Sequence, residues 1–504
     1  MINVRLLLTA AAAVAIVTSG DASAQTPNRK QIETIVAGQH DSNVKALQDW
    51  IALPTIAAEG KNVPEGAEYM RRLALDAGFQ KARIVPSGGV PGVFATLDSG
   101  AKTTLGIYFM YDVKQFDPAE WSSPPLEGRL VQREGEGTVL MGRGAVNQKG
   151  PEMAFLAAVK AIRASGRKLP VNLVLVAEGE EEIASPNFPT VVADPEVAAA
   201  LKKTVGVFIP STSQDAQGNA GITLGAKGAV EFQLVVGGET SDKYPKTDIH
   251  SSNHARVESP AWRLVKALDT LVADDGHTPA IDGWFENVAP LTARQKELIA
   301  QRVAATDEAD VKKGLGVGRW INNEDYRTSS ERFLSQPTVN IQGLVSGYQG
   351  PGGKTVLPGR AEAKLEFRLV PNMTKDEAVS KLKAHLAKRN FDDVRVNVSG
   401  GYGPNQTDEN SAFIQAQKRV FEKAGITYTL TPRNAGSWPG VVFNGAPLNL
   451  PTGQFGISRG NGAHAPNEWV LIKSSNPKVA GFDENVLLYV DYMYEVAQAA
   501  GGRR

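Results

Sequence analysis

A short apolar segment in the first half of the chain most constrains its fold. Residues 171–176 are apolar except for Asn172, and a proline and a run of glutamates bound them. A run of this length predicts a β-strand buried on both faces, as in sheets covered by helices. Residues 105–109 predict a second, short apolar strand, and residues 64–77 and 151–165 predict helices. This alternation indicates an α/β layer domain.

The pattern changes near Gly221, where half-buried strands return around two helices. The predicted strands are 229–236, 338–344 and 361–370, and the predicted helices are 260–272 and 375–387. The first pattern resumes after about Gly400. We therefore predict a discontinuous catalytic domain over residues 25–220 and 401–504, interrupted by a smaller α+β domain over residues 221–400.

The N-terminus has the pattern of a secretory signal peptide. Arg5 precedes an apolar core over residues 6–17, and Ala22-Ser23-Ala24 resembles a cleavage site. The core is too short to span a bilayer, which argues against the alternative of an N-terminal anchor. We expect residues 1–24 to be removed, so that the mature protein starts at Gln25 and is periplasmic or secreted. No other stretch predicts a membrane span.

Composition excludes several classes of function. Lys plus Arg and Asp plus Glu both number 54, so the balanced charge argues against nucleic acid or an anionic membrane as partner. The chain contains no cysteine. It therefore has no disulfides and no thiolate for a nucleophile, a zinc ribbon or an iron–sulfur cluster.

Carboxylates follow the two predicted apolar strands. Glu180, Glu181 and Glu182 come directly after residues 171–176, at a kind of strand end where active sites gather. Two adjacent carboxylates there can divide the work, one binding a metal and the other accepting a proton. The alternative is a solvated acidic turn. Asp112 ends the other strand and could orient a ligand, or could be a turn residue.

Three further polar residues are ambiguous when taken singly. His464 lies in a glycine-rich loop, where it could bind a metal or simply face solvent. Arg368 lies near the end of a predicted strand, where its guanidinium could bind a substrate carboxylate or form a surface ion pair. His250, in the inserted domain, indicates little alone.

Together these segments resemble a zinc metallopeptidase family that includes carnosinase-type dipeptidases, glutamate carboxypeptidase and aminoacylase. The resemblance covers essentially the whole mature chain, and the dipeptidase-like branch fits best. Its ordered matches include Asp112-Val113, Gly142-Arg143-Gly144-Ala145, Lys149-Gly150-Pro151, Glu178-Gly179-x-Glu181-Glu182, Asp248-x-His250-Ser251, Arg368-Leu369-Val370-Pro371, Gly436-Ser437-x-Pro439 and His464-x-Pro466-Asn467-Glu468.

The resemblance implies a role for each of these residues. Glu181 would be the general base, Glu182 and His464 ligands of one metal, and Asp112 the orienting carboxylate. His250 would reach the active site of a partner subunit and polarise the scissile carbonyl. A substrate carboxylate would bind Arg368, with Ser437 as a further binding residue. The inserted domain would act as a lid and form the interface of a homodimer.

Three positions depart from this family pattern. Met110 stands where a His ligand is expected, Asn147 where an Asp bridges two metals, and Ser211 where a third acidic ligand is expected. Thioether, amide and hydroxyl groups are poor zinc ligands. We therefore do not expect a two-metal centre. One Zn or Mn ion on Glu182, His464 and Asn147 would be weakly held.

Three hypotheses for function follow. The first is an exported hydrolase of small peptides or N-acyl amino acids, resembling a dipeptidase or carboxypeptidase, with at most one metal. The second is a non-catalytic protein that binds a peptide or amino-acid derivative on the same fold, which the three lost ligands favour. The third is metal-free chemistry that uses Glu181 as the base. Retention of Glu181, Asp112 and His250 favours the first.

Overall fold

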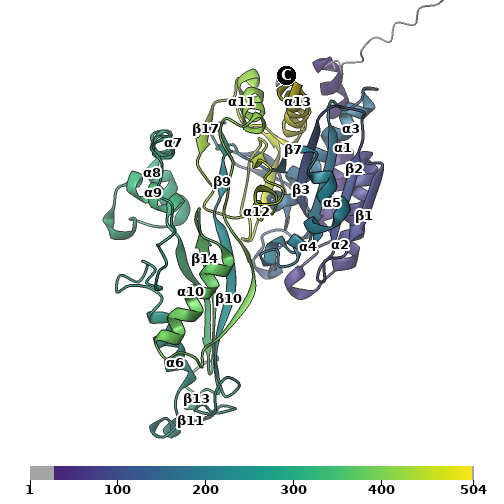
Figure 1. The fold of residues 1–504 in the computed structure, drawn as a ribbon. Helices are drawn as coiled ribbons and strands as arrows, with labels where there is room; N and C mark the ends of the chain where they lie inside the picture. The colour runs from purple at the N-terminus through teal and green to yellow at the C-terminus, as the bar shows by residue number, and fades with distance from the viewer. Residues whose placement is uncertain (1–27, 502–504) are drawn as a thin grey trace, which may run out of the picture.

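The computed structural model describes residues 28–501, so the predicted leader over residues 1–24 lies outside the described residues. The chain forms two units, each with a β-sheet and helices, which lie side by side in Figure 1. The first is built on an eight-stranded sheet in the order β1-β2-β6-β3-β7-β18-β8-β17. Its strands are β1 (Lys81–Val85), β2 (Gly92–Leu97), β3 (Thr104–Met110), β6 (Asn172–Glu178), β7 (Thr204–Pro210), β8 (Ala220–Thr223), β17 (Tyr428–Thr431) and β18 (Thr452–Phe455).

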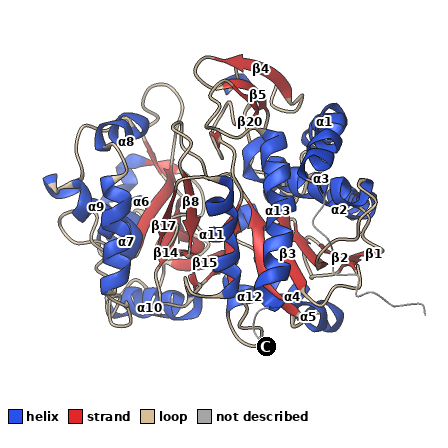
Figure 2. Cartoon of the chain, turned by 90° about the horizontal axis from the view of Figure 1, so that it is seen from above, coloured by secondary structure: helices blue, strands red, loops and turns tan. Residues whose placement is uncertain are grey.

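The apolar strands of this sheet are buried on both faces, as the sequence predicts. In β6, Leu173 and Leu175 pack with the helices of one face, whereas Val174 and Val176 pack with the other. The first face carries α1 (Arg29–Ile51), α2 (Val63–Ala77), α3 (Gly150–Ala164), α11 (Ala412–Ala424) and α13 (Phe482–Gly501). The second carries α4 (Phe188–Ala193) and α5 (Pro195–Leu201). Figure 2 shows these layers from above.

The second unit is a four-stranded antiparallel sheet with helices on one face. Its order is β12-β14-β10-β15, and its strands are β10 (Gly228–Gly237), β12 (Thr338–Ser346), β14 (Arg360–Leu369) and β15 (Arg395–Tyr402). Alternate residues of β10, such as Phe232 and Leu234, pack beneath α6 (Pro260–Asp269) and α10 (Lys375–Lys388). A helical segment, α7 (Ala293–Ala304), α8 (Glu308–Leu315) and α9 (Tyr326–Ser335), lies beside this sheet (Figure 2).

Short elements complete the fold. A second four-stranded sheet, β19-β20-β5-β4, lies beside the first unit; its strands are β4 (Arg129–Arg133), β5 (Gly137–Met141), β19 (Gly460–Asn461) and β20 (Trp469–Ser474). Two-residue strands form the pairs β9 (Gly225–Ala226) with β16 (Asn405–Gln406) and β11 (Ile249–His250) with β13 (Val356–Leu357). A short helix, α12 (Val441–Asn444), lies between β17 and β18 in the chain.

The observed architecture confirms the predicted fold class. The chain leaves the large sheet after β8, builds the second sheet, and returns to the large sheet at β17. Each strand and helix predicted above has a counterpart in the structure, although the domain boundaries at residues 220 and 400 stay predictions. Among the described residues, none of the helices combines the length and apolarity needed to cross a membrane.

Candidate active site

The candidate site lies where parallel strands of the large sheet end together. β3 pairs in parallel with both β6 and β7, so the carboxyl ends of these three strands meet at one edge. Asp112 follows β3, a short helical turn over Glu181–Ile183 follows β6, and Ser211 follows β7. The sheet therefore gathers segments that are distant in sequence.

Asp112 fixes the turn that carries the two glutamates. Its buried Oδ2 accepts a hydrogen bond from the backbone N–H of Glu182 at 3.0 Å. Within residues 28–501, its Oδ1 has no hydrogen-bond partner. Burial, followed by the negative charge of Glu182, raises the pKa of Asp112 to about 8. A buried carboxylate oxygen without a hydrogen bond lowers the stability of the folded state. In this site that oxygen belongs to Asp112, beside the turn that carries the two glutamates.

Glu182, Asn147 and His464 form one hydrogen-bonded cluster. The Asn147 Nδ2 lies 2.7 Å from Glu182 Oε1 and 3.0 Å from His464 Nε2, and His464 Nε2 lies 3.1 Å from Glu182 Oε2. The amide must present its NH₂ group to Glu182, because a carboxylate only accepts hydrogen bonds. Glu182 is buried, whereas the His464 side chain is 53% exposed. The structure thus brings together the three residues predicted to hold a single metal.

Glu181 precedes Glu182 of this cluster in the chain and is half-buried. Burial raises its pKa well above the usual range, and the negative charges of Glu182, Asp112 and Glu178 add to the rise. The positive charge of Lys114 opposes it. A carboxylate with a raised pKa is a stronger base than a solvated one, as a group that accepts a proton from water must be.

Met110 and Ser211 offer no ligand to this cluster. Met110 is buried in the apolar layer over α4 and α5, and its backbone N–H donates to Glu152 Oε1 at 2.8 Å. Ser211 is tied to the sheet through its backbone N–H, which donates to Phe455 O at 3.0 Å. Across residues 28–501, no three His, Asp or Glu side chains converge so that they could hold a metal ion. The donors do not fit a two-metal centre, and a single ion would have two strong ligands and one amide.

Lys114, the second residue after Asp112, also belongs to the site, although it was not predicted from the sequence. Its Nζ donates to the carbonyl oxygen of Glu182 and lies 3.6 Å from Glu182 Oε2. An ammonium group therefore faces the acidic turn. Its place directly after the Asp112-Val113 motif was the only signal for it in the sequence.

Glu468 is a second residue whose role the motif alone does not reveal. Its Oε2 accepts from Arg143 at 2.7 Å and from the Gly144 N–H at 3.0 Å, and its Oε1 accepts from the Asn147 N–H at 2.9 Å. Arg143 and Glu468 are both buried. Glu468 thereby holds the loop that presents Asn147 to Glu182.

Glu468→Gln is expected to destabilise the protein by about 3 kcal/mol, because buried Arg143 loses its counter-charge while an NH₂ group replaces one acceptor. The midpoint of urea unfolding measures this. Glu127→Gln is a matched control, since Glu127 forms an exposed ion pair with Arg129 and should change stability by less than about 0.5 kcal/mol. Equal effects of the two substitutions would contradict the assigned role.

Arg368 and Ser437 also lie together, but the arginine already has a carboxylate partner. Arg368 Nε and one terminal nitrogen donate to the two oxygens of Glu366, both at 2.7 Å, and the other terminal nitrogen donates to Ser437 Oγ at 2.6 Å. The Tyr402 hydroxyl lies 3.3 Å from Ser437 Oγ. A substrate carboxylate must therefore share Arg368 with Glu366 or displace Ser437.

His250 is not part of this site within one chain. It is exposed, lies in the short pair β11–β13, and bonds its own neighbour Ser252 Oγ at 2.8 Å. Figure 1 shows β11 and β13 at the tip of the second unit, away from the ends of β3 and β7. A role in a partner's site stays a prediction.

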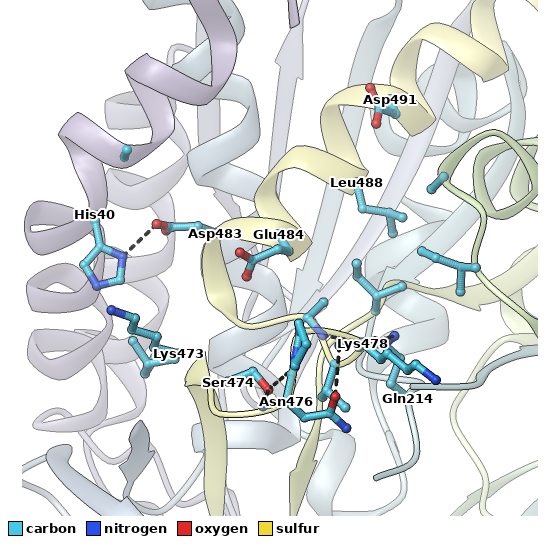
Figure 3. A pocket seen from close by; sticks show the side chains of 18 of the residues that line it. His40, Gln214, Lys473, Ser474, Asn476, Lys478, Asp483, Glu484, Leu488 and Asp491 are labelled. Atoms are coloured by element: carbon cyan, nitrogen blue, oxygen red, sulfur yellow. Dashed lines mark hydrogen bonds and ion pairs between the residues drawn. The ribbon is translucent and has the colours of Figure 1, made fainter. Parts of the chain in front are cut away.

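A cavity of about 730 Å³ on the first unit contains none of the predicted site residues. It lies between α1, α13 and the segment after β20, as Figure 3 shows. His40 and Asp483 pair across one side of it at 2.9 Å. It is therefore separate from the candidate active site.

Comparison with known proteins tests the resemblance. Cys-Gly metallodipeptidase DUG1 of Saccharomyces cerevisiae is 28% identical over 475 residues, covering 88% of this chain and 94% of that protein. The Beta-Ala-His dipeptidase of Homo sapiens is 27% identical over 372 residues, covering 69% and 70% of the two chains. The M20 family metallo-carboxypeptidase Sso-CP2 from Sulfolobus solfataricus superposes with a TM-score of 0.78 at 31% identity, covering 91% and 99%.

These findings confirm the predicted family and its hydrolase character. The relatives are named metallodipeptidases and a metallo-carboxypeptidase, and the family implies a metal cofactor. The profile of peptidase family M20/M25/M40 matches residues 111–485, from just before Asp112 to beyond Glu468. Because this match spans most of the chain and includes both ends of the candidate site, the protein belongs to peptidase family M20/M25/M40.

Proposed function

We propose that this protein is an exported hydrolase of small peptides or N-acyl amino acids that works with at most one metal ion. The observation that carries the proposal is the position of Glu181, a half-buried residue beside the cluster of Glu182, Asn147 and His464. The leader predicted over residues 1–24 supports export to the periplasm or the medium.

Each group has a distinct part in the proposed mechanism. Glu181 accepts a proton from the attacking water and later gives it to the leaving amine. Asp112 holds the turn that orients Glu181 and Glu182. Arg368 and Ser437 bind the substrate carboxylate. When bound by Glu182, His464 and Asn147, one zinc or manganese ion supplies Lewis acidity to the water.

Metal content tests the number of ions. The mature protein, purified without chelator and supplied with Zn and Mn, is expected to carry no more than one equivalent by inductively coupled plasma mass spectrometry. Glu182→Ala or His464→Ala should remove any bound ion, because each deletes one of the two strong ligands. Two equivalents in the unsubstituted protein would contradict the proposal. A panel of dipeptides and N-acyl amino acids tests hydrolysis itself.

A binding protein on the same fold is the second candidate. Met110, Asn147 and Ser211 favour it, since each replaces a donor that a two-metal hydrolase needs. In either case a ligand carboxylate would have to share Arg368 with Glu366 or displace Ser437 from it. Metal-free chemistry based on Glu181 is the remaining alternative, and it predicts turnover that chelators do not affect.

We further propose a homodimer that pairs the second units, in which His250 completes the partner's site. β12 is an edge strand, and its Ile341, Leu344 and Val345 are about half exposed. Light scattering should give the mass of a dimer. The double substitution Leu344→Glu with Val345→Glu should give a monomer, because charges on an exposed edge strand oppose pairing. Val317→Glu, at another exposed apolar position, should stay dimeric. A monomeric unsubstituted protein would remove any role of His250 in trans.

A further inference from the structure

A cavity of about 740 Å³ lies between the helical segment α7–α9 and the end of β14. Its wall is largely apolar and includes Ile299, Leu315, Trp320 and Phe333. A volume of this size is typical of small-molecule sites, which combine an apolar lining with a few polar groups.

The inner wall of this cavity carries a buried ammonium group without a counter-ion. Lys227 is 3% exposed, and its Nζ donates to Gln336 O at 2.7 Å. No carboxylate pairs with Lys227 in the part of the chain that the structure describes. Burial, together with the positive charges of Arg433 and Arg368, lowers the pKa of Lys227 to about 8. An anion bound beside Lys227 would therefore compensate its unpaired positive charge.

The acidic groups nearby are already paired. Glu324 lines the cavity but lies 2.6 Å from Arg332, and Glu366 is engaged by Arg368. Arg433, behind the wall, donates to the carbonyl of Leu334 at 2.9 Å, and it too lacks a carboxylate partner among residues 28–501. Arg302 of α7 also lines the cavity, so positive charge is in excess around it.

The cavity shares one residue, Arg368, with the predicted substrate-binding residues. Arg368 lines it and donates to Ser437, which the Tyr402 hydroxyl also contacts. The neighbouring Gly401 N–H donates to Ala184 O at 3.0 Å, and the Ala184 N–H donates to Glu181 O at 3.0 Å. A single line of contacts therefore leads from the cavity to the residue proposed as the base.

We propose that this cavity is the specificity pocket of the site and takes a ligand that carries both a carboxylate and a bulky apolar group. Lys227 holds the carboxylate together with Arg368, and the wall of α7–α9 packs on the apolar group. The inference rests on the proposed function, since it names the substrate class of that site: amino-acid derivatives with an aromatic or large aliphatic side chain and a free carboxylate.

Three small probes that contain no amide bond test this pairing of charge and apolar surface. 3-Phenylpropanoate carries both features, propanoate lacks the ring, and 3-phenylpropan-1-ol lacks the charge. Titration calorimetry on the mature protein should show that 3-phenylpropanoate binds at least about tenfold more tightly than either of the others. Equal affinities for all three would overturn the proposal.

Substitutions assign the binding to this cavity. Lys227→Met keeps the aliphatic stem but removes the charge, and should weaken 3-phenylpropanoate by about tenfold or more. Ser330→Trp, at a half-buried position of α9 that lines the cavity, should fill it and weaken binding similarly. Lys313→Met, at an exposed position of α8, is the matched control and should bind normally. If Lys227→Met fails to fold, Ser330→Trp alone decides, and normal binding by that variant would overturn the assignment.

The two proposals can fail separately. The probes could bind with the expected preferences, and respond to the substitutions as expected, in a protein that hydrolyses no peptide. That result would support the pocket and contradict the proposed activity. Hydrolysis of Ala-Gly as fast as Ala-Phe, together with no binding of 3-phenylpropanoate, would support the activity and overturn the pocket.

Discussion

Glu181→Gln is expected to lower kcat by about 10²–10⁴-fold while leaving the Kd of a bound ligand nearly unchanged. The substitution preserves the size and most contacts of the side chain but removes its ability to accept a proton. Burial and the charges of Glu182 and Asp112 raise the pKa of Glu181, which supports the proposal that it is the base. Steady-state kinetics with a dipeptide, and calorimetry with 3-phenylpropanoate, measure the two quantities.

Glu180→Gln is the matched control for this experiment. Glu180 is the preceding residue, but its carboxylate accepts hydrogen bonds from the backbone N–H groups of Val90 and Asn187 and serves to fix the loop. We expect a modest loss of stability and little change in kcat. If Glu181→Gln retains full turnover, the base is another group. A protein that binds ligands but shows no turnover before substitution is the binding protein of the second hypothesis.

The fold and the core of the site were predictable because their signals are local. Apolar runs such as residues 171–176 need no knowledge of distant contacts to be recognised as buried strands. Asp112 and Glu182 directly follow such strands, so the parallel sheet alone brings them together. Which residue acts as the base or a ligand stays a prediction, since it rests on the family resemblance.

Contacts between distant segments were not predictable in the same way. Glu468 bonds Arg143 across 325 residues, and its motif says nothing of that partner. The direction of the Lys114 side chain depends on the turn that carries Glu182. The pairing of Arg368 with Glu366 had a readable signal, because residues two apart share one face of a strand.

Asn147→Asp is expected to convert the hydrogen-bonded cluster into a site that needs a cation. In the structure the Asn147 amide donates to Glu182 Oε1 at 2.7 Å. A carboxylate at the same place would set two negative charges in contact beside buried Asp112, so the variant without metal should be less stable than the parent. Zinc would relieve that repulsion and gain a third strong ligand. At a zinc concentration about 100-fold above Kd, the stabilisation should reach about 2.7 kcal/mol.

Thermal unfolding with and without zinc measures this response. Asn410→Asp, in an exposed turn before α11, introduces the same charge away from the site and should show no added response to zinc. A zinc response of Asn147→Asp no larger than that of the parent would contradict the view that the amide has replaced a metal ligand.

Adding Met110→His and Ser211→Asp to Asn147→Asp tests whether a second metal ion can bind when all three replaced ligands are restored. The family resemblance places all three positions in one metal site. Met110 and Ser211 lie at the same edge of the sheet as Glu182, where three parallel strands end. With an imidazole and two carboxylates restored, two cations can share an anionic bridge. The triple variant should therefore bind two equivalents of zinc, where we expect the parent to bind at most one. If the triple variant folds but still binds no more than one, the buried setting of Met110, rather than its thioether, keeps the second ion out.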